Sequence, residues 1–280
     1  MVTDSVANLQ ATFSDRLRGR AAEIGSWLCI GLDPQTDSLP AGIARDARGL
    51  VEFCDRIVRA TRDYALCYKI NFAFFEALGS GGWIALEETR RTIPSDIAVI
   101  ADAKRGDIAS TMSQYARAIF ERMDFDAVTL NPFLGWDALE PFLDYPGRAA
   151  FILSRTSNPG AGHFQELSTD GIPLYLRVAA EAAAMSRPTE AGVVAGATDL
   201  GALHEVRAID ENLLLLVPGV GAQGGSASAA HRIASNGRGE NALITMSRSI
   251  LYASPGEDFE NAAAAAARDA AAQTRLGPQS

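Results

Sequence analysis

Residues 97–107 read IAVIADAKRGD, a short aliphatic run that ends abruptly in charged residues. Ile97–Asp102 has the length and the β-branched content of a strand. In an extended segment residues i and i+2 point to the same side, so Asp102 and Lys104 are expected to face the same way. The stretch therefore predicts a buried strand that carries charge at its carboxyl end.

Similar runs recur along the chain, each ending near Gly, Asp, Asn, Ser or Pro. The eight predicted strands are Trp27–Leu32, Tyr64–Ile70, Ile97–Asp102, Ala127–Leu130, Ala149–Ser154, Gly192–Ala195, Leu213–Val217 and Ala242–Met246. Stretches with helical spacing separate them, such as Gly49–Arg62, whose apolar residues fall on one face. This alternation predicts parallel strands. Eight of them favour a closed (β/α)8 TIM barrel over an open sheet, which more often stops at five or six.

The 280 residues fit a single barrel domain, because no linker, low-complexity segment or repeated motif divides residues 1–280. An extra N-terminal helix is expected over Asn8–Ile24. The Ala-rich Phe259–Thr274 is expected to form the last outer helix, followed by a short frayed tail.

The composition and net charge of the chain limit the kinds of molecule that it is expected to bind. Hydrophobic residues make up 48% and charged residues 21%, typical of a globular protein, and the net charge is −9. This surface repels nucleic acid and anionic lipid. The N-terminus does not resemble a signal peptide, and the longest apolar run, around Leu213–Val217, is too short to span a bilayer, so a cytoplasmic location is expected. The odd set Cys29, Cys54 and Cys67 is expected to be reduced and buried.

The predicted strand ends are rich in charge. Asp33 follows the first strand in GLDP, Lys69 belongs to YKINFAFFE, and Asp102, Lys104 and Asp107 belong to DAKRGDIAST. Because the carboxyl ends of barrel strands surround one active site, these side chains are expected to meet. Alternating signs would keep every member ionised. A salt-bridge network that only stabilises the fold is the alternative.

A second group of residues suits a phosphate. PGVGAQGG, residues 218–225, offers backbone N–H groups after the seventh strand, and Arg248 in SRSI follows the eighth. Arginine can hold a phosphate with two parallel hydrogen bonds. A tight turn alone would also explain the glycines, but the pairing with Arg248 favours a phosphate site.

For several other polar residues the sequence allows more than one role. His163, His204 and His231 show no metal-ligand spacing, and the latter two fall in expected outer helices; His163 follows the fifth strand and is open between the surface and the barrel mouth. Asn131 is either a partner behind the site or a turn residue. Glu76 either orients a side chain of the second strand or solvates a helix.

Taken in order, GLDP, YKINFAFFE, DAKRGDI, TSNPGA, PGVGAQGG and SRSI resemble the orotidine 5′-phosphate decarboxylases, from Asp33 to Arg248. The spacing to NFAFFE resembles the longer bacterial branch of that family, type 2. Related sugar-phosphate enzymes share D-x-K-x-x-D but place a metal-binding Glu where this chain has Lys69. Ser247 departs from the shorter branch, which has Gly before the Arg that is expected to bind the phosphate.

The resemblance implies a role for each matching residue. Lys104 would be the proton donor, Lys69 and Asp102 would orient the ribose and the charge array, and Asp107 would enter the neighbouring subunit's site, which implies an obligate homodimer. The implied substrate contacts are Asp33 and Thr111 to the ribose, Ser157 and Pro218 to the pyrimidine, and Gln223 and Arg248 to the 5′-phosphate.

The expected function is decarboxylation of orotidine 5′-phosphate to UMP, the last step of de novo pyrimidine biosynthesis, without metal or other cofactor. Three alternatives remain: a metal-dependent sugar-phosphate decarboxylase, a Schiff-base aldolase that uses Lys104, and a non-catalytic sensor of a phosphorylated ligand.

Overall fold

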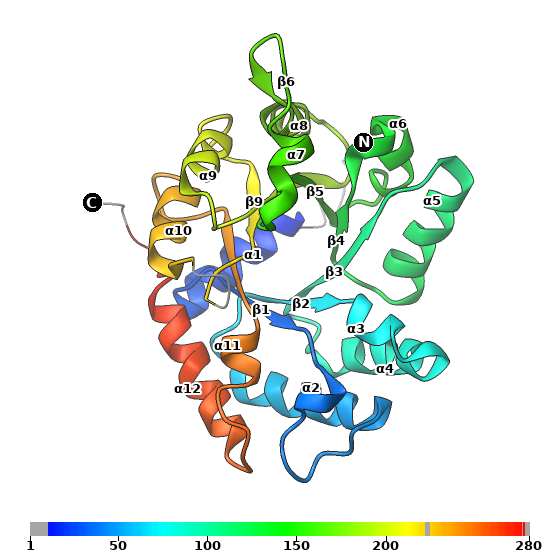
Figure 1. The fold of residues 1–280 in the computed structure, drawn as a ribbon, viewed down its shortest axis with the longest axis vertical. Helices are drawn as coiled ribbons and strands as arrows, with labels where there is room; N and C mark the ends of the chain where they lie inside the picture. The colour runs from blue at the N-terminus through cyan, green and yellow to red at the C-terminus, as the bar shows by residue number, and fades with distance from the viewer. Residues whose placement is uncertain (1–10, 222–224, 276, 278–280) are drawn as a thin grey trace, which may run out of the picture.

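Eight parallel strands close into a barrel in the computed structural model, which describes residues 11–221, 225–275 and 277 (Figure 1). The strand order around the barrel is β1-β10-β9-β8-β5-β4-β3-β2. The bounds are β1 Leu28–Leu32, β2 Cys67–Asn71, β3 Ala98–Arg105, β4 Ala127–Leu130, β5 Ala149–Arg155, β8 Glu190–Ala195, β9 Leu214–Val217 and β10 Ala242–Met246. The predicted fold is confirmed, and all eight predicted strands are present.

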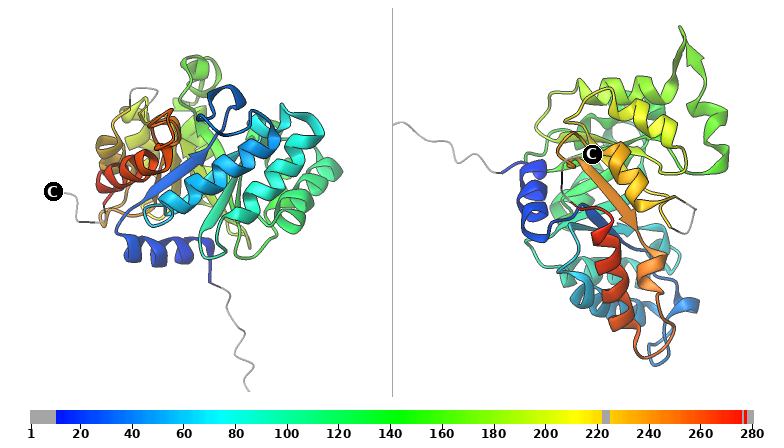
Figure 2. Two further views of the ribbon diagram at one scale, coloured as in Figure 1. Left: turned by 90° about the horizontal axis from the view of Figure 1, so that it is seen from below. Right: turned by 90° about the vertical axis from the view of Figure 1, so that its left-hand side faces the viewer.

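Helices surround the strands and bury a continuous apolar layer against them (Figures 1 and 2). Their bounds are α1 Phe13–Ile24, α2 Ala47–Thr61, α3 Ala73–Glu76, α4 Gly79–Thr92, α5 Ala109–Ala116, α6 Trp136–Leu139, α7 Gly162–Gln165, α8 Leu174–Ala183, α9 Leu200–Arg207, α10 Ala227–Ala234, α11 Arg248–Leu251 and α12 Phe259–Ala272. Helix α2 illustrates the packing, because Leu50, Phe53 and Ile57 form its fully buried face.

Helix α1 lies across the amino-terminal end of the barrel (Figure 2). It begins at Phe13, later than predicted, because the hydroxyl of Thr12 accepts a hydrogen bond from the Asp15 N–H and caps the helix there. The predicted start at Asn8 lies outside the described residues. Phe13 and Leu17 are buried, and the Phe13 ring meets Phe151 of β5 edge-on, with 6.1 Å between the ring centroids. The helix therefore closes the end of the barrel opposite the strand carboxyl ends.

Helix α12 ends at Ala272, two residues before the predicted end. The chain leaves the helix because the carbonyl of Thr274 accepts a hydrogen bond from the Trp27 N–H, 3.0 Å away, just before β1. The predicted tail lies largely outside the described residues. Among the described helices, none is long and apolar enough to cross a membrane.

One small element was not predicted. Strands β6, Ser168–Thr169, and β7, Ile172–Pro173, form an antiparallel hairpin that projects from the barrel (Figure 1). Its turn residues Asp170 and Gly171 have φ values of 56° and 78°, in the left-handed region that a two-residue hairpin turn requires.

Candidate active site

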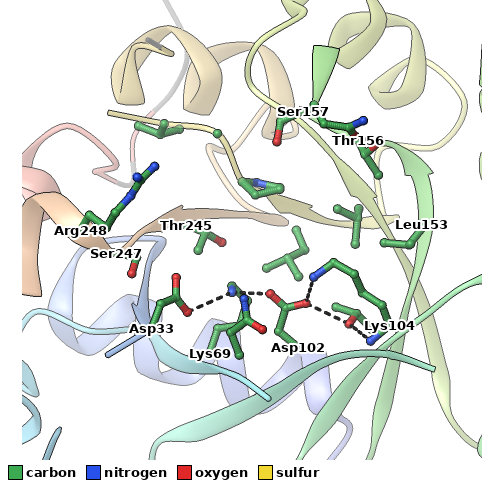
Figure 3. Close-up of a pocket in the computed structure, with 18 of the residues that line it drawn as sticks. Asp33, Lys69, Asp102, Lys104, Leu153, Thr156, Ser157, Thr245, Ser247 and Arg248 are labelled. Carbon is green, nitrogen blue, oxygen red and sulfur yellow. Dashed lines mark hydrogen bonds and ion pairs between the residues drawn. The ribbon is translucent and has the colours of Figure 1, made fainter. Parts of the chain in front are cut away.

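Alternate residues of each strand face the barrel interior. Near α1 these inward residues are small or apolar, for example Cys29 on β1, Cys67 on β2 and Ala98 on β3. At the carboxyl ends of β1, β2, β3, β4 and β10 the inward residues become polar. Together with the apolar Leu153, Val194 and Leu216 of β5, β8 and β9, they line a pocket of about 540 Å³. Its lining includes Asp33, Lys69, Asn71, Asp102, Lys104, Thr129, Ser157, Pro218, Thr245, Ser247 and Arg248 (Figure 3).

Four charged side chains of alternating sign form a row along the pocket floor (Figure 3). Nζ of Lys69 lies 3.9 Å from Oδ1 of Asp33 and 2.6 Å from Oδ2 of Asp102. The other oxygen of Asp102, Oδ1, accepts a hydrogen bond from Nζ of Lys104 at 2.5 Å. The predicted meeting is therefore confirmed for Asp33, Lys69, Asp102 and Lys104, from three strands, and not for Asp107.

The row keeps its central pair ionised. Burial lowers the pKa of Lys69, but the negative charges of Asp102 and Asp33 outweigh this effect, and the net pKa is well above its usual value. Burial raises the pKa of Asp102, and the positive charges of Lys69 and Lys104 outweigh it, so the net pKa is well below its usual range. Lys104 differs from Lys69 because about half of its side chain remains exposed toward the pocket.

The residues predicted to bind a phosphate lie across the pocket from Lys104 (Figure 3). Gly219 and Gly221, with φ values of 94° and 76°, follow β9, and Arg248 begins α11 after β10. Ser247 has φ −131°, so a residue with a side chain is accommodated there without left-handed strain. Gln223, predicted to contact the phosphate, lies outside the described residues.

Two predicted residues lie elsewhere. Asp107 and Thr111, both described, do not line this pocket. Asp107 is half-buried, and its carboxylate accepts a hydrogen bond from the Ile108 N–H at 2.7 Å. Among the described residues of this chain, the carboxylate that holds Lys104 is that of Asp102.

Several pocket residues were missed in the sequence. They are Asn71, Thr129, Thr156, Asn158, Gln165 and Thr245. Gln165 holds the loop after β5, because its carbonyl oxygen accepts from the Thr156 N–H at 2.9 Å and its amide donates to the Thr156 hydroxyl at 2.8 Å. Thr129 and Thr245 continue the inward alternation of β4 and β10, and this two-residue period could have identified them.

The structure shows the surroundings of the residues to which the sequence assigned no single role. Asn131 is a turn residue, because its side chain accepts from the Phe133 N–H at 3.0 Å. Glu76 pairs with Arg105 of β3 at 2.6 Å, a partner that neither interpretation included. His204 and His231 lie on outer helices as expected, and His163 lies exposed on α7 outside the pocket. The three cysteines are free and buried, as expected.

A closed (β/α)8 barrel with a lysine and carboxylate row on one side of its mouth and a Gly-rich loop plus arginine on the other defines an enzyme for a small phosphorylated substrate. The family is equally clear, because the model of the "Orotidine 5'-phosphate decarboxylase / HUMPS family" matches residues 26–265. The chain belongs to this family.

Individual relatives agree. An orotidine 5′-phosphate decarboxylase of Herpetosiphon aurantiacus is 46% identical over 90% of this chain and 93% of its own length. A decarboxylase of the same name from Roseiflexus sp. is 47% identical over 94% of this chain and 96% of its own length. The solved structure of Leishmania donovani OMP decarboxylase has a TM-score of 0.81 and 38% identity, and it covers 94% of this chain and 99% of that one. The predicted resemblance and enzyme class, a carboxy-lyase, are confirmed.

Proposed function

We propose that the protein converts orotidine 5′-phosphate to UMP and CO2, with Lys104 as the residue that stabilises and then protonates the reacting carbon. One observation carries the assignment of this role: Nζ of Lys104 is fixed at 2.5 Å from Asp102 while the side chain stays about half exposed in the pocket. The ammonium group is thus held by one hydrogen bond to Asp102, and its exposed side can face a ligand in the pocket.

The chemistry requires such a group. Loss of CO2 from C6 of the pyrimidine breaks the C6–carboxylate bond and leaves the electron pair on C6, with no adjacent electron sink. A fixed positive charge stabilises this carbanion. The ammonium then donates its proton to C6, and the neutral amine is reprotonated from water. No metal or organic cofactor enters this scheme.

Asp102 keeps Lys104 oriented, and Lys69 supports Asp102 from behind. Asp33 would bind a ribose hydroxyl, a role supported by its position in the pocket lining beside Lys69. Ser157 and Pro218 line the pocket and would contact the pyrimidine, and Arg248 with Gln223 would bind the 5′-phosphate.

The site is proposed to be completed by a second copy of the chain, which would bring Asp107 toward Lys104 and Thr111 toward the ribose. The surface around Asp107 supports this homodimer. Ile108, Phe133 and Leu134 are 65%, 78% and 45% exposed on the adjacent loops after β3 and β4. Large exposed apolar side chains beside a polar site are typical of an interface.

The proposed reaction is tested by mixing EDTA-treated protein with orotidine 5′-phosphate and following the ultraviolet absorbance of the pyrimidine. We expect rapid formation of UMP, and a rate at least about 100-fold lower with Lys104→Ala. If the intact protein is inactive after EDTA but active with magnesium, a metal-dependent mechanism replaces this one. Inactivity under both conditions contradicts the proposed substrate.

A further inference from the structure

The pairing of β3 with β4 is irregular beside the active site. Ala101 pairs with Val128 and Arg105 pairs with Leu130, so residues 102–104 of β3 face the single residue Thr129 of β4. Such a bulge redirects side chains but leaves backbone groups without their ladder partners. The proposed proton donor, Lys104, and the residue whose carboxylate holds it, Asp102, both lie within this bulge.

Lys104 adopts an uncommon backbone conformation in the bulge. Its φ is 47°, in the left-handed region, which is unfavourable for a residue with a side chain. A conformation of this kind persists only where the surroundings hold it. The contact that does so is not a backbone ladder bond, because the Lys104 N–H donates to the hydroxyl of Thr129 at 2.9 Å.

The same hydroxyl also fixes the partner of the Lys104 ammonium. Thr129 Oγ1 donates its proton to Oδ1 of Asp102 at 3.2 Å, the oxygen that accepts from Lys104 Nζ. A hydroxyl has one proton to donate and lone pairs to accept with, so both capacities are used here. Thr129 is 1% exposed, and water therefore has little access to replace either bond.

We propose that Thr129 is a positioning residue for the reaction: its hydroxyl ties the backbone of Lys104 to the carboxylate of Asp102 and thereby sets the direction of the ammonium. This inference rests on the role proposed for Lys104. Because both hydrogen bonds of the hydroxyl are made to the protein, we expect its removal to change substrate binding little.

The test compares Thr129→Val, which keeps the shape and removes the hydroxyl, with Thr129→Ser, which keeps the hydroxyl. We expect Thr129→Val to lower kcat about 10- to 100-fold, the effect of displacing a reacting group by up to an ångström. The KM and the Kd for UMP should change less than about threefold, and Thr129→Ser should retain kcat within about threefold. Thr89→Val, a fully buried threonine on the outer helix α4, controls for loss of a buried hydroxyl and should leave kcat unchanged.

A kcat for Thr129→Val within twofold of the native value overturns the proposal. A rise in KM with unchanged kcat also overturns it, because Thr129 would then be a binding residue. An equal loss of kcat in Thr129→Ser overturns it too, because the methyl group and not the hydroxyl would then be decisive. Thr129→Ala takes the place of the Val variant if the latter does not fold, as judged by thermal unfolding.

The role of Lys104 is judged separately by Lys104→Ala. Adding Thr129→Val to Lys104→Ala should cause no further loss, because Thr129 acts through the lysine. A further loss comparable to that in the native background contradicts the proposal for Thr129. Full activity of Lys104→Ala contradicts the proposed function instead.

Discussion

Gly31 on β1 and Ser247 after β10 approach each other so closely that a Cβ on residue 31 would lie 2.9 Å from Cβ of Ser247. Real side chains do not tolerate this distance, so one of the two positions must lack a side chain. Ser247 directly precedes Arg248, the proposed phosphate ligand, and the contact therefore links the first strand to the phosphate end of the pocket.

Gly31→Ala is expected to raise the KM for orotidine 5′-phosphate about tenfold, because overpacking by one methyl group costs roughly 1–3 kcal/mol and displaces Ser247 with its neighbour Arg248. Ser247→Gly in the same chain removes the clash and should restore the KM to within about threefold of that of Ser247→Gly alone. Steady-state kinetics on the three variants measure this. An unchanged KM in Gly31→Ala, or no relief by Ser247→Gly, would show that the phosphate end does not depend on this contact.

The proposed sharing of sites between two chains predicts complementation. Lys104→Ala and Asp107→Ala should each lose at least about 100-fold in kcat. Hybrid dimers formed from an equal mixture combine one native and one doubly altered site, so random mixing should restore about a quarter of the native activity. The assay follows activity after the two proteins are mixed, denatured and refolded together. A mixture no more active than its parents would place Asp107 outside the partner's site.

Stability should depend on pH through His231 on α10. This residue is 4% exposed, and its Nε2 lies 3.2 Å from the carbonyl oxygen of Gly239. Burial lowers the pKa of His231, against a smaller opposing effect of the Gly239 hydrogen bond. Below its unfolded pKa of about 6.5, the unfolded chain binds a proton that the folded chain resists, so stability decreases as pH falls.

Urea unfolding at several pH values between 7 and 5 measures this dependence. The slope of the unfolding free energy against pH should flatten in His231→Gln. His204→Gln, an exposed histidine on α9, should leave the slope as it is in the native chain. If His231→Gln keeps the native slope, other groups carry the pH dependence.

The sequence was sufficient to predict the barrel because each strand is a compact apolar run. Strands β4 and β10 match their predicted bounds, whereas β2 begins at Cys67 instead of Tyr64 because the apolar residues before it are buried without forming regular strand. The β6–β7 hairpin was overlooked although its Asp170-Gly171 pair is a strong turn signal. Its strands are only two residues long and carry no apolar alternation.

The active-site residues were predictable where a charged residue lies near the carboxyl end of an apolar strand, as Lys69 and Asp102 do. The two-residue period of β4 could have placed Thr129 in the pocket, but its contact with Lys104 could not be predicted. That contact arises from the bulge in β3, and the displacement of register is decided by packing between two strands. The proposed contribution of Asp107 came from family resemblance, since a single chain places its carboxylate outside its own pocket.

The role of Lys104 is tested most directly by removing its ammonium and then restoring it. The three native cysteines are buried, so a cysteine introduced by Lys104→Cys is the preferred target for 2-bromoethylamine, whose alkylation forms a C–S bond, releases bromide and rebuilds an ammonium of lysine length. We predict that Lys104→Cys loses at least about 1,000-fold in kcat and regains a large part of it after alkylation, while the treated native protein is unaffected. A cysteine variant that decarboxylates at the native rate, or a folded, fully alkylated variant that remains inactive, would contradict this account.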